Sequence, residues 1–391
     1  MNYILFDGAV RNQLLPFTYT RPVADVRVGI LTIREKWEKF LGSTTTTVTE
    51  DYLADKFPMV ELDHNVLINA SFCPSENLVQ LITNLKENQA IFYKDEPLAF
   101  YSTEDQEIDF DAFEISQYRE DDVLRIENTW DIFEKNHEAI QRDFDVLTQG
   151  RTSAPIPETV VVFHPERVFI EQGAVLLSCS LNAEQGPIYI GKDAVVMEGA
   201  LIRGPFALCD HATVKMAAKI YGATTIGPHC KVGGEVANSV MMGYSNKGHD
   251  GYLGNSVLGE WCNLGADTNT SNLKNNYAEV RLWNYDSGRF SKTGTQFCGL
   301  MMGDHSKCGI NTMFNTGTVV GVSANIFGAG YPRNFIPSFT WGGPAGMETY
   351  NTNKAFDVAK VVMARRGIDF DTQEEAILNE VFEQSKEWRS F

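Results

Sequence analysis

Residues 188–232 read IYIGKDAVVMEGALIRGPFALCDHATVKMAAKIYGATTIGPHCKV, and this stretch decides the fold of half the chain. An α-helix repeats every ~3.6 residues and a flat strand every second residue, but here every sixth residue is aliphatic. A hexapeptide repeat is typical of a parallel β-helix, in which short strands stack coil on coil around one apolar core. The ladder consists of Ile190, Val196, Ile202, Leu208, Val214, Ile220, Ile226 and Val232.

The spacing of six returns after an interruption, so the β-helix is expected over 159–343. The second run consists of Met302, Cys308, Phe314, Val320 and Ile326. After the Gly/Pro-rich stretch at 341–346 the pattern becomes helical, and we expect C-terminal helices within 344–391, at 355–366 and 372–388.

The first 126 residues alternate apolar strands with amphipathic helices, which indicates an α/β domain over 1–126. Strands are expected at 3–6, 65–69 and 90–93. Helices are expected at 30–41 and 75–85, the second capped by Ser75. Residues 127–158 are expected to form a connecting helix, at 128–147, and a linker rich in Ser, Thr and Pro.

The composition limits the partners. The chain has 391 residues, with 33 Lys and Arg against 51 Asp and Glu, a net charge of -18. A nucleic-acid partner is not expected, because phosphate backbones need a basic face. No signal-peptide pattern and no membrane-length apolar run is present, so we expect a cytoplasmic protein without a membrane partner. The 7 cysteines form no CxxC pair, and no zinc site or other metal site is expected.

The interruption of the ladder concentrates polar residues among glycines. Residues 238–276 read NSVMMGYSNKGHDGYLGNSVLGEWCNLGADTNTSNLKNN, and Lys247 and His249 lie within them. Insertions are expected to leave the coils as loops, and loops on a rigid scaffold commonly carry function. A neutral imidazole can remove a proton from an attacking amine near pH 7. The alternative is a histidine with no catalytic role.

Residues 249–268 resemble the acetyltransferase segment of the bifunctional enzyme family that makes UDP-N-acetylglucosamine. That family shows the pattern H-x-x-Y-x-G-(x)4-G-(x)3-N-[IL]-G-A-x-T. The matching residues are His249, Tyr252, Gly254, Gly259, Asn263, Leu264, Gly265, Ala266 and Thr268.

The resemblance implies a left-handed parallel β-helix, a homotrimer and acetyl-CoA as cosubstrate. It implies that His249 is the general base, that Tyr252 contacts the substrate phosphate and that Asn263 holds the sugar. The Ala266 backbone would meet the pantetheine arm. Asn272 would help to bind the sugar, and Lys219 falls near the family's phosphate-binding arginine.

Two positions depart from that family. Ala237 replaces a lysine, and Ile310 replaces a serine. The sequence therefore predicts an acetyl-CoA-dependent N-acyltransferase whose small-molecule acceptor is an amino-sugar phosphate or a nucleotide amino-sugar. A catalytically silent trimeric scaffold is the alternative.

Residues 5–27, LFDGAVRNQLLPFTYTRPVADVR, resemble the sugar-1-phosphate nucleotidyltransferases, which have a Rossmann-type fold. The resemblance is carried by LPFT at 15–18 and by Arg21 with the following proline. It implies nucleotide binding by Gly8, Arg11 and Arg21.

The chemistry of this domain is poorly matched. The family's catalytic arginine position holds Gln13, and its metal-binding Gly-Asp position holds Ala70 and Ser71. The vacated positions favour a silent domain, with Mg²⁺ expected only if it is active. The alternative is uridylyl or thymidylyl transfer here, with the β-helix as a trimerisation scaffold.

Overall fold

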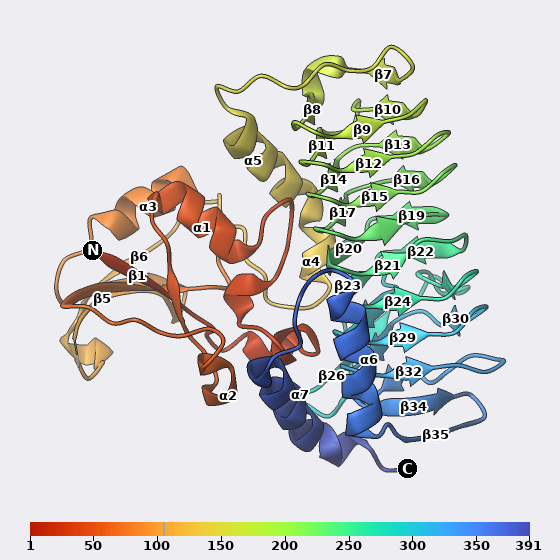
Figure 1. The fold of residues 1–391 in the computed structure, drawn as a ribbon. Helices are drawn as coiled ribbons and strands as arrows, with labels where there is room; N and C mark the ends of the chain where they lie inside the picture. Colours follow the sequence, from red (N-terminus) through yellow and green to blue (C-terminus); the bar gives the residue numbers. More distant parts are fainter. Residues whose placement is uncertain (105) are drawn as a thin grey trace.

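A computed structural model describes residues 1–104 and 106–391, as three parts. An N-terminal α/β domain lies beside a long parallel β-helix, and two C-terminal helices pack where the two meet (Figure 1). This is the expected fold class. None of the described helices combines the length and the apolarity of a membrane span.

The N-terminal sheet has the strand order β2-β1-β3-β5-β4-β6. Strand β1 runs parallel to β2 and β3, whereas β5 is antiparallel to β3 and β4. The strands are β1 (Asn2–Phe6), β2 (Thr46–Val48), β3 (His64–Asn69), β4 (Gln89–Tyr93), β5 (Glu96–Thr103) and β6 (Glu114–Gln117). The three expected strands are β1, β3 and β4.

The helices of this domain are α1 (Ile33–Leu41), α2 (Asp51–Ala54) and α3 (Glu76–Thr83). Helix α1 begins three residues later than expected, because Thr32 and Glu35 form a capping box at its start. Ser75 caps α3 as expected and accepts a hydrogen bond from the Leu78 N–H. The expected connecting helix is two helices, α4 (Asp131–Glu134) and α5 (Asn136–Thr148).

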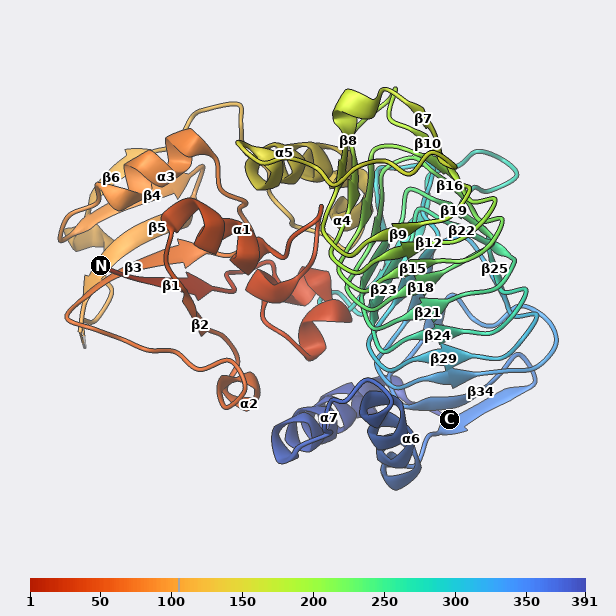
Figure 2. The ribbon, with the colours of Figure 1, turned by 45° about the horizontal axis from the view of Figure 1, so that its top comes forward.

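The β-helix is a prism with three faces, which we name the Tyr252 face, the docking face and the Asn263 face (Figure 2). The Tyr252 face consists of β7 (Val161–Phe163), β10 (Ser180–Asn182), β13 (Leu201–Arg203), β16 (Lys219–Tyr221), β19 (Glu235–Ala237) and β22 (Tyr252–Gly254). The docking face consists of β8 (Val168–Ile170), β11 (Ile188–Ile190), β14 (Phe206–Leu208), β17 (Thr224–Ile226), β20 (Val240–Gly243), β23 (Val257–Glu260), β28 (Leu300–Met302), β31 (Thr318–Val320) and β33 (Phe335–Ile336). The Asn263 face consists of β9 (Val175–Leu176), β12 (Val195–Val196), β15 (Thr213–Val214), β18 (Lys231–Val232), β21 (Asn246–Lys247), β24 (Asn263–Leu264), β29 (Lys307–Cys308), β32 (Asn325–Ile326), β34 (Thr340–Gly343) and β35 (Gly346–Thr349).

The predicted ladder is confirmed as the core of this prism. Ile190, Val196 and Ile202 lie on the docking, Asn263 and Tyr252 faces in turn, and all three are buried. Residues of the ladder that lie 18 positions apart, such as Val196 and Val214, pair in register on one face. Each hexapeptide repeat therefore forms one face of the prism, and three repeats form one complete coil.

The expectation that residues 238–276 leave the coils as loops is wrong for most of this stretch. Strands β20 to β24 continue the three faces through it, because the turns between strands are only shortened. The long insertion that does leave the coils is 271–299, between β25 (Asn269–Thr270) and β28. Strand β25 itself pairs with β30 (Met313–Phe314). It carries the hairpin of β26 (Arg281–Asn284) and β27 (Arg289–Lys292).

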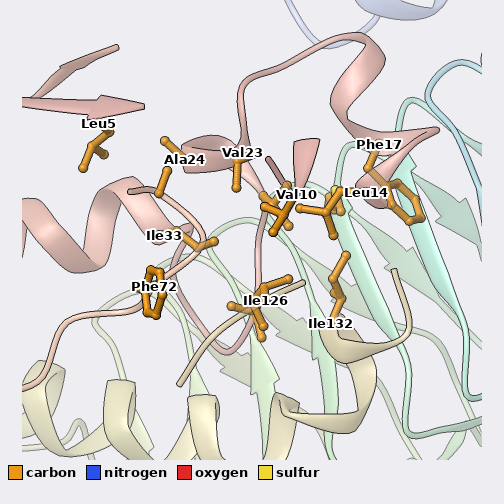
Figure 3. Packing of buried hydrophobic residues seen from close by; sticks show 14 of the residues in the cluster. Leu5, Val10, Leu14, Phe17, Val23, Ala24, Ile33, Phe72, Ile126 and Ile132 are labelled. Atoms are coloured by element: carbon orange, nitrogen blue, oxygen red, sulfur yellow. The ribbon is translucent and has the colours of Figure 1, made fainter. Parts of the chain in front are cut away.

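One apolar cluster joins the N-terminal domain to the docking face. Leu14 and Phe17 from the N-terminal loops (Figure 3) belong to the same buried cluster as Val240 and Met301 of the docking face. Helix α6 (Thr352–Ala364) lies along the prism, and α7 (Thr372–Gln384) contacts α2 (Figure 1). The loop end of the N-terminal domain is therefore packed against the β-helix.

Candidate functional site

His249 lies in the tight turn between β21 and β22, with an exposed side chain. Two glycines of the preceding coil make room for this turn. A Cβ on Gly234 would stand 2.8 Å from the His249 carbonyl oxygen, and one on Gly233 would stand 2.5 Å from the Gly248 carbonyl oxygen. No described side chain hydrogen-bonds to the His249 ring, which leaves the imidazole open to a ligand.

Lys247 holds the backbone of His249 from inside the prism. Its side chain is 2% exposed and occupies an inward ladder position, in register with Val232. Its Nζ donates a hydrogen bond of 2.6 Å to the His249 carbonyl oxygen. Burial lowers the pKa of the Lys247 ammonium to about 8, against the partial compensation of Asp250 and Asp267.

Tyr252 and Asn272, which are 20 residues apart, meet on the Tyr252 face. The Asn272 amide donates to the Tyr252 hydroxyl at 3.1 Å and to the Asn255 side-chain oxygen at 2.8 Å. Burial raises the pKa of the Tyr252 phenol, so its hydroxyl is kept protonated.

Lys219 reaches the same face but is already paired. Its ammonium lies 3.6 Å from the carboxylate of Glu235, which stands in register between Lys219 and Tyr252. The Tyr221 hydroxyl also donates to Glu235, at 2.7 Å. Glu235 thus cancels the positive charge expected to attract a phosphate.

Asn263 lies on the neighbouring Asn263 face, where its side-chain oxygen accepts from the Asn246 amide at 2.8 Å. Ala266 lies two residues after the end of β24. The N–H groups beside it, of Gly265 and Asp267, are bonded to carbonyl oxygens, whereas no described residue accepts from the Ala266 N–H. One N–H in this turn is therefore available to an external oxygen.

The structure thus brings Tyr252 and Asn272 together and places Lys219 on their face. Asn263 lies on the neighbouring face of the prism, and Ala266 lies in the turn that follows it.

The departures from the family have physical consequences. Ala237 is buried in register with Gly254, so no cation stands there. Ile310 is 71% exposed and offers an apolar surface where the family has a hydroxyl.

The N-terminal candidate site is a pocket of about 300 Å³ around Gly8 and Arg11. The Arg11 guanidinium donates to the Thr18 carbonyl and the Tyr52 hydroxyl, and it lies 3.4 Å from the Asp7 carboxylate. The Arg11 guanidinium is therefore already bound by groups of the same domain, which would compete with a nucleotide phosphate.

The structure does not bring Arg21 to this pocket. Arg21 is buried against the β-helix, where its guanidinium pairs with Asp304 and lies 3.2 Å from Glu260. These carboxylates raise its pKa further above the ordinary value, against the effect of burial. Gln13 is likewise engaged, and it accepts from the Asn284 amide of the β26–β27 hairpin at 2.6 Å.

The residues of this domain do not fit a bound Mg²⁺. Ser71 donates to the Asn69 side chain and accepts from Arg125, so a cation already lies where the family places a carboxylate. In the described part of the chain, no three His, Cys, Asp or Glu side chains come together as a metal site.

The sequence analysis noted Lys247 but predicted no position or role for it, and it did not identify Glu235 as a residue of the site. A signal for Lys247 was present, because it lies 17 residues before Leu264 and so falls on the inward ladder of a slightly shortened coil. Glu235 carried no such signal, since its role depends on the cross-strand register.

The fold and these segments define a protein with an N-terminal α/β domain docked on a parallel β-helix of hexapeptide repeats. Residues 3–152 match the family model described as sugar nucleotidyl transferase. The N-terminal domain is therefore similar to sugar nucleotidyl transferases, and the chain is similar to bifunctional nucleotidylyltransferase/acetyltransferase proteins.

Among its relatives is the bifunctional protein GlmU of Methanocaldococcus jannaschii, 32% identical over 192 residues, 49% of this chain and 40% of that protein. Another is the bifunctional sugar-1-phosphate nucleotidylyltransferase/acetyltransferase of Sulfurisphaera tokodaii, 31% identical over 145 residues, 37% of this chain and 36% of that protein. The aligned part spans about two fifths or less of these relatives' length. The structure of the polySia-specific acetyltransferase NeuO aligns over 49% of this chain and 86% of its own, with 13% identity and a TM-score of 0.25.

Proposed function

We propose that this protein is an acetyl-CoA-dependent N-acyltransferase that acts on an amino-sugar phosphate or a nucleotide-linked amino sugar. The observation that carries the proposal is the His249 turn. An exposed imidazole is fixed through its own backbone by Lys247, three residues before Tyr252, which in turn pairs with Asn272. The names of the two relatives, one of them an acetyltransferase, agree with this activity.

In the proposed reaction His249 removes a proton from the acceptor amine as the nitrogen attacks the thioester carbonyl carbon. The carbonyl oxygen becomes an oxyanion, and the unbonded Ala266 N–H would donate to it. Collapse of this intermediate breaks the carbon–sulfur bond, and the leaving thiolate takes up the proton from His249.

A single chain does not close this site, because its parts lie on two faces of one prism. In a homotrimer of side-by-side prisms, the Tyr252 face of one subunit would meet the Asn263 face of the next. Exposed apolar residues on the Tyr252 face support such packing: Val161, Phe163 and Leu201 are each more than half exposed.

The test is acetyl-CoA turnover with a panel of amino-sugar phosphates and nucleotide amino-sugars. His249→Asn is expected to abolish most of the turnover. His164→Asn is the matched control, since His164 is also an exposed histidine on a β-helix turn. Equal turnover in both variants would remove His249 from the mechanism, and no turnover with any acceptor would favour the silent scaffold.

Nucleotidyl transfer by the N-terminal domain is the second candidate, favoured by the pocket that remains around Gly8 and Arg11. It predicts pyrophosphate release from UTP or dTTP with a hexose 1-phosphate, lost in Arg11→Gln. Gln13 and Arg21 are bonded to residues of the β-helix part of the chain, and this counts against nucleotidyl transfer.

A further inference from the structure

A pocket on the Asn263 face is strongly positive, although the chain as a whole is negative. It has a volume of about 520 Å³ and lies between the strands of this face and the end of α6. That volume is in the range of small-molecule sites. Four cations line it: Lys231, Lys307, Arg365 and Arg366.

These cations lack carboxylate partners. In the described part of the chain, none of the four lies within an ion-pair distance of an Asp or Glu. Glu260 and Asp304, on neighbouring coils, are bonded to Arg21 in a separate pocket. A chain with a net charge of -18 has therefore left four positive charges unneutralised around one cavity.

Lys231 lies close enough to the two arginines to be repelled by them. Burial lowers the pKa of the Lys231 ammonium, and Arg366, Lys215 and Arg365 lower it further. Burial lowers the pKa of Lys307 to about 8, although its Nζ donates to the His305 carbonyl oxygen at 2.8 Å. An anionic ligand beside Lys231 would relieve this repulsion.

The rest of the wall also suits an anion. Tyr244 and Trp261 stack face to face with ring centroids 4.2 Å apart, so they turn ring edges, the positive part of an aromatic ring, toward the pocket. The carboxyl end of α6 is partially negative. Its last carbonyls, however, already accept backbone N–H groups of Arg366 and Gly367, so the two arginines dominate.

We propose that this pocket binds a diphosphate group, held by Lys231, Lys307 and the arginine pair Arg365–Arg366. Four cations exceed the requirement of a phosphate monoester and match the two linked phosphates of a diphosphate ester. The Tyr252 face, where Glu235 cancels Lys219, offers no such charge. Whether the diphosphate belongs to a nucleotide amino-sugar or to coenzyme A rests on the proposed function, but diphosphate binding itself does not.

The test is calorimetric titration of the full chain with pyrophosphate, UDP, coenzyme A and inorganic phosphate. Pyrophosphate is expected to bind at least tenfold more tightly than phosphate. Lys231→Gln and Arg366→Gln are each expected to weaken it about tenfold or more. Lys360→Gln is the matched control, because Lys360 lies on the same helix but pairs with Glu375 outside the pocket, and it should change affinity less than twofold.

UDP binding with these sensitivities would assign the site to the acceptor, and coenzyme A binding would assign it to the donor. Absence of pyrophosphate binding, or equal weakening by Lys360→Gln, would overturn the proposal. Binding without acetyl-CoA turnover would refute the proposed function and leave the pocket standing. Turnover without pyrophosphate binding would refute the diphosphate pocket and leave the proposed function standing.

Discussion

Replacing Lys247 by Met should stabilise the protein at pH 7. The Lys247 ammonium is buried in the prism, and its pKa falls from 10.5 to about 8. Because each pKa unit corresponds to about 1.4 kcal/mol, keeping this group charged costs the folded state about 3 kcal/mol. Met has nearly the same length and fits an apolar core, but the hydrogen bond to the His249 carbonyl is lost, at a cost of about 1 kcal/mol. The net gain is about 2 kcal/mol.

The gain from Lys247→Met should disappear as the pH rises. Between pH 8 and 10.5 the unfolded chain holds a proton on Lys247 that the folded chain has released, so the wild type gains stability as the pH rises. By pH 10 the remaining penalty of about 1 kcal/mol is matched by the hydrogen bond that Met lacks, so the difference between Lys247→Met and the wild type should fall from about 2 kcal/mol to about zero. Urea unfolding at pH 7 and pH 10, at one protein concentration, measures both differences. Lys192→Met, at an exposed lysine, should change stability little at either pH. A Lys247→Met difference that does not depend on pH would refute the reasoning.

Two further predictions concern the same coils. Gly234→Ala should cost about 1–2 kcal/mol more in urea unfolding than Gly150→Ala and should lower acetyl transfer. Both glycines have φ near +70°, but only at Gly234 does an added Cβ meet the His249 carbonyl, whereas Gly150 has open space. A similar cost for both would show that the turn can move aside. His305→Asn should flatten the loss of stability in acid: burial holds the His305 pKa well below 6.5, so below that pH the unfolded chain takes up a proton that the folded chain does not. Parallel pH 5 and pH 7 unfolding curves for the variant and the wild type would contradict this.

The sequence predicts the β-helix well because a hexad is a direct record of its geometry. Nearly all inward residues are apolar and successive ones fall on successive faces, so the spacing of Ile190, Val196 and Ile202 already contains the three faces. The same rule explains the error over 238–276. Shortened turns shift the spacing from 18 residues to 15 between Val232 and Lys247, so the ladder looks interrupted in the sequence although the coils continue.

The candidate site could be predicted only as a set of residues, because spacing along the chain does not report which face a residue occupies. Tyr252 and Asn263 are 11 residues apart, yet the corner of the prism separates them. The charge balance is equally hidden. Glu235 cancels Lys219 through a cross-strand contact, whereas the cations of the diphosphate pocket come from two strands and from the residues that follow α6, more than a hundred positions after Lys231.

The N-terminal domain shows most clearly why a degenerate motif cannot be read from sequence alone. Arg21 matches a family position, and in isolation it would count as a retained phosphate-binding cation. In the structure it is buried between Asp304 and Glu260, and removing one partner of such a buried pair costs about 3–5 kcal/mol. A nucleotide phosphate would have to compete with both carboxylates and with the apolar docking surface around them. Binding of a nucleotide by Arg21 and docking of this domain on the β-helix therefore exclude each other, and the observed contacts favour docking.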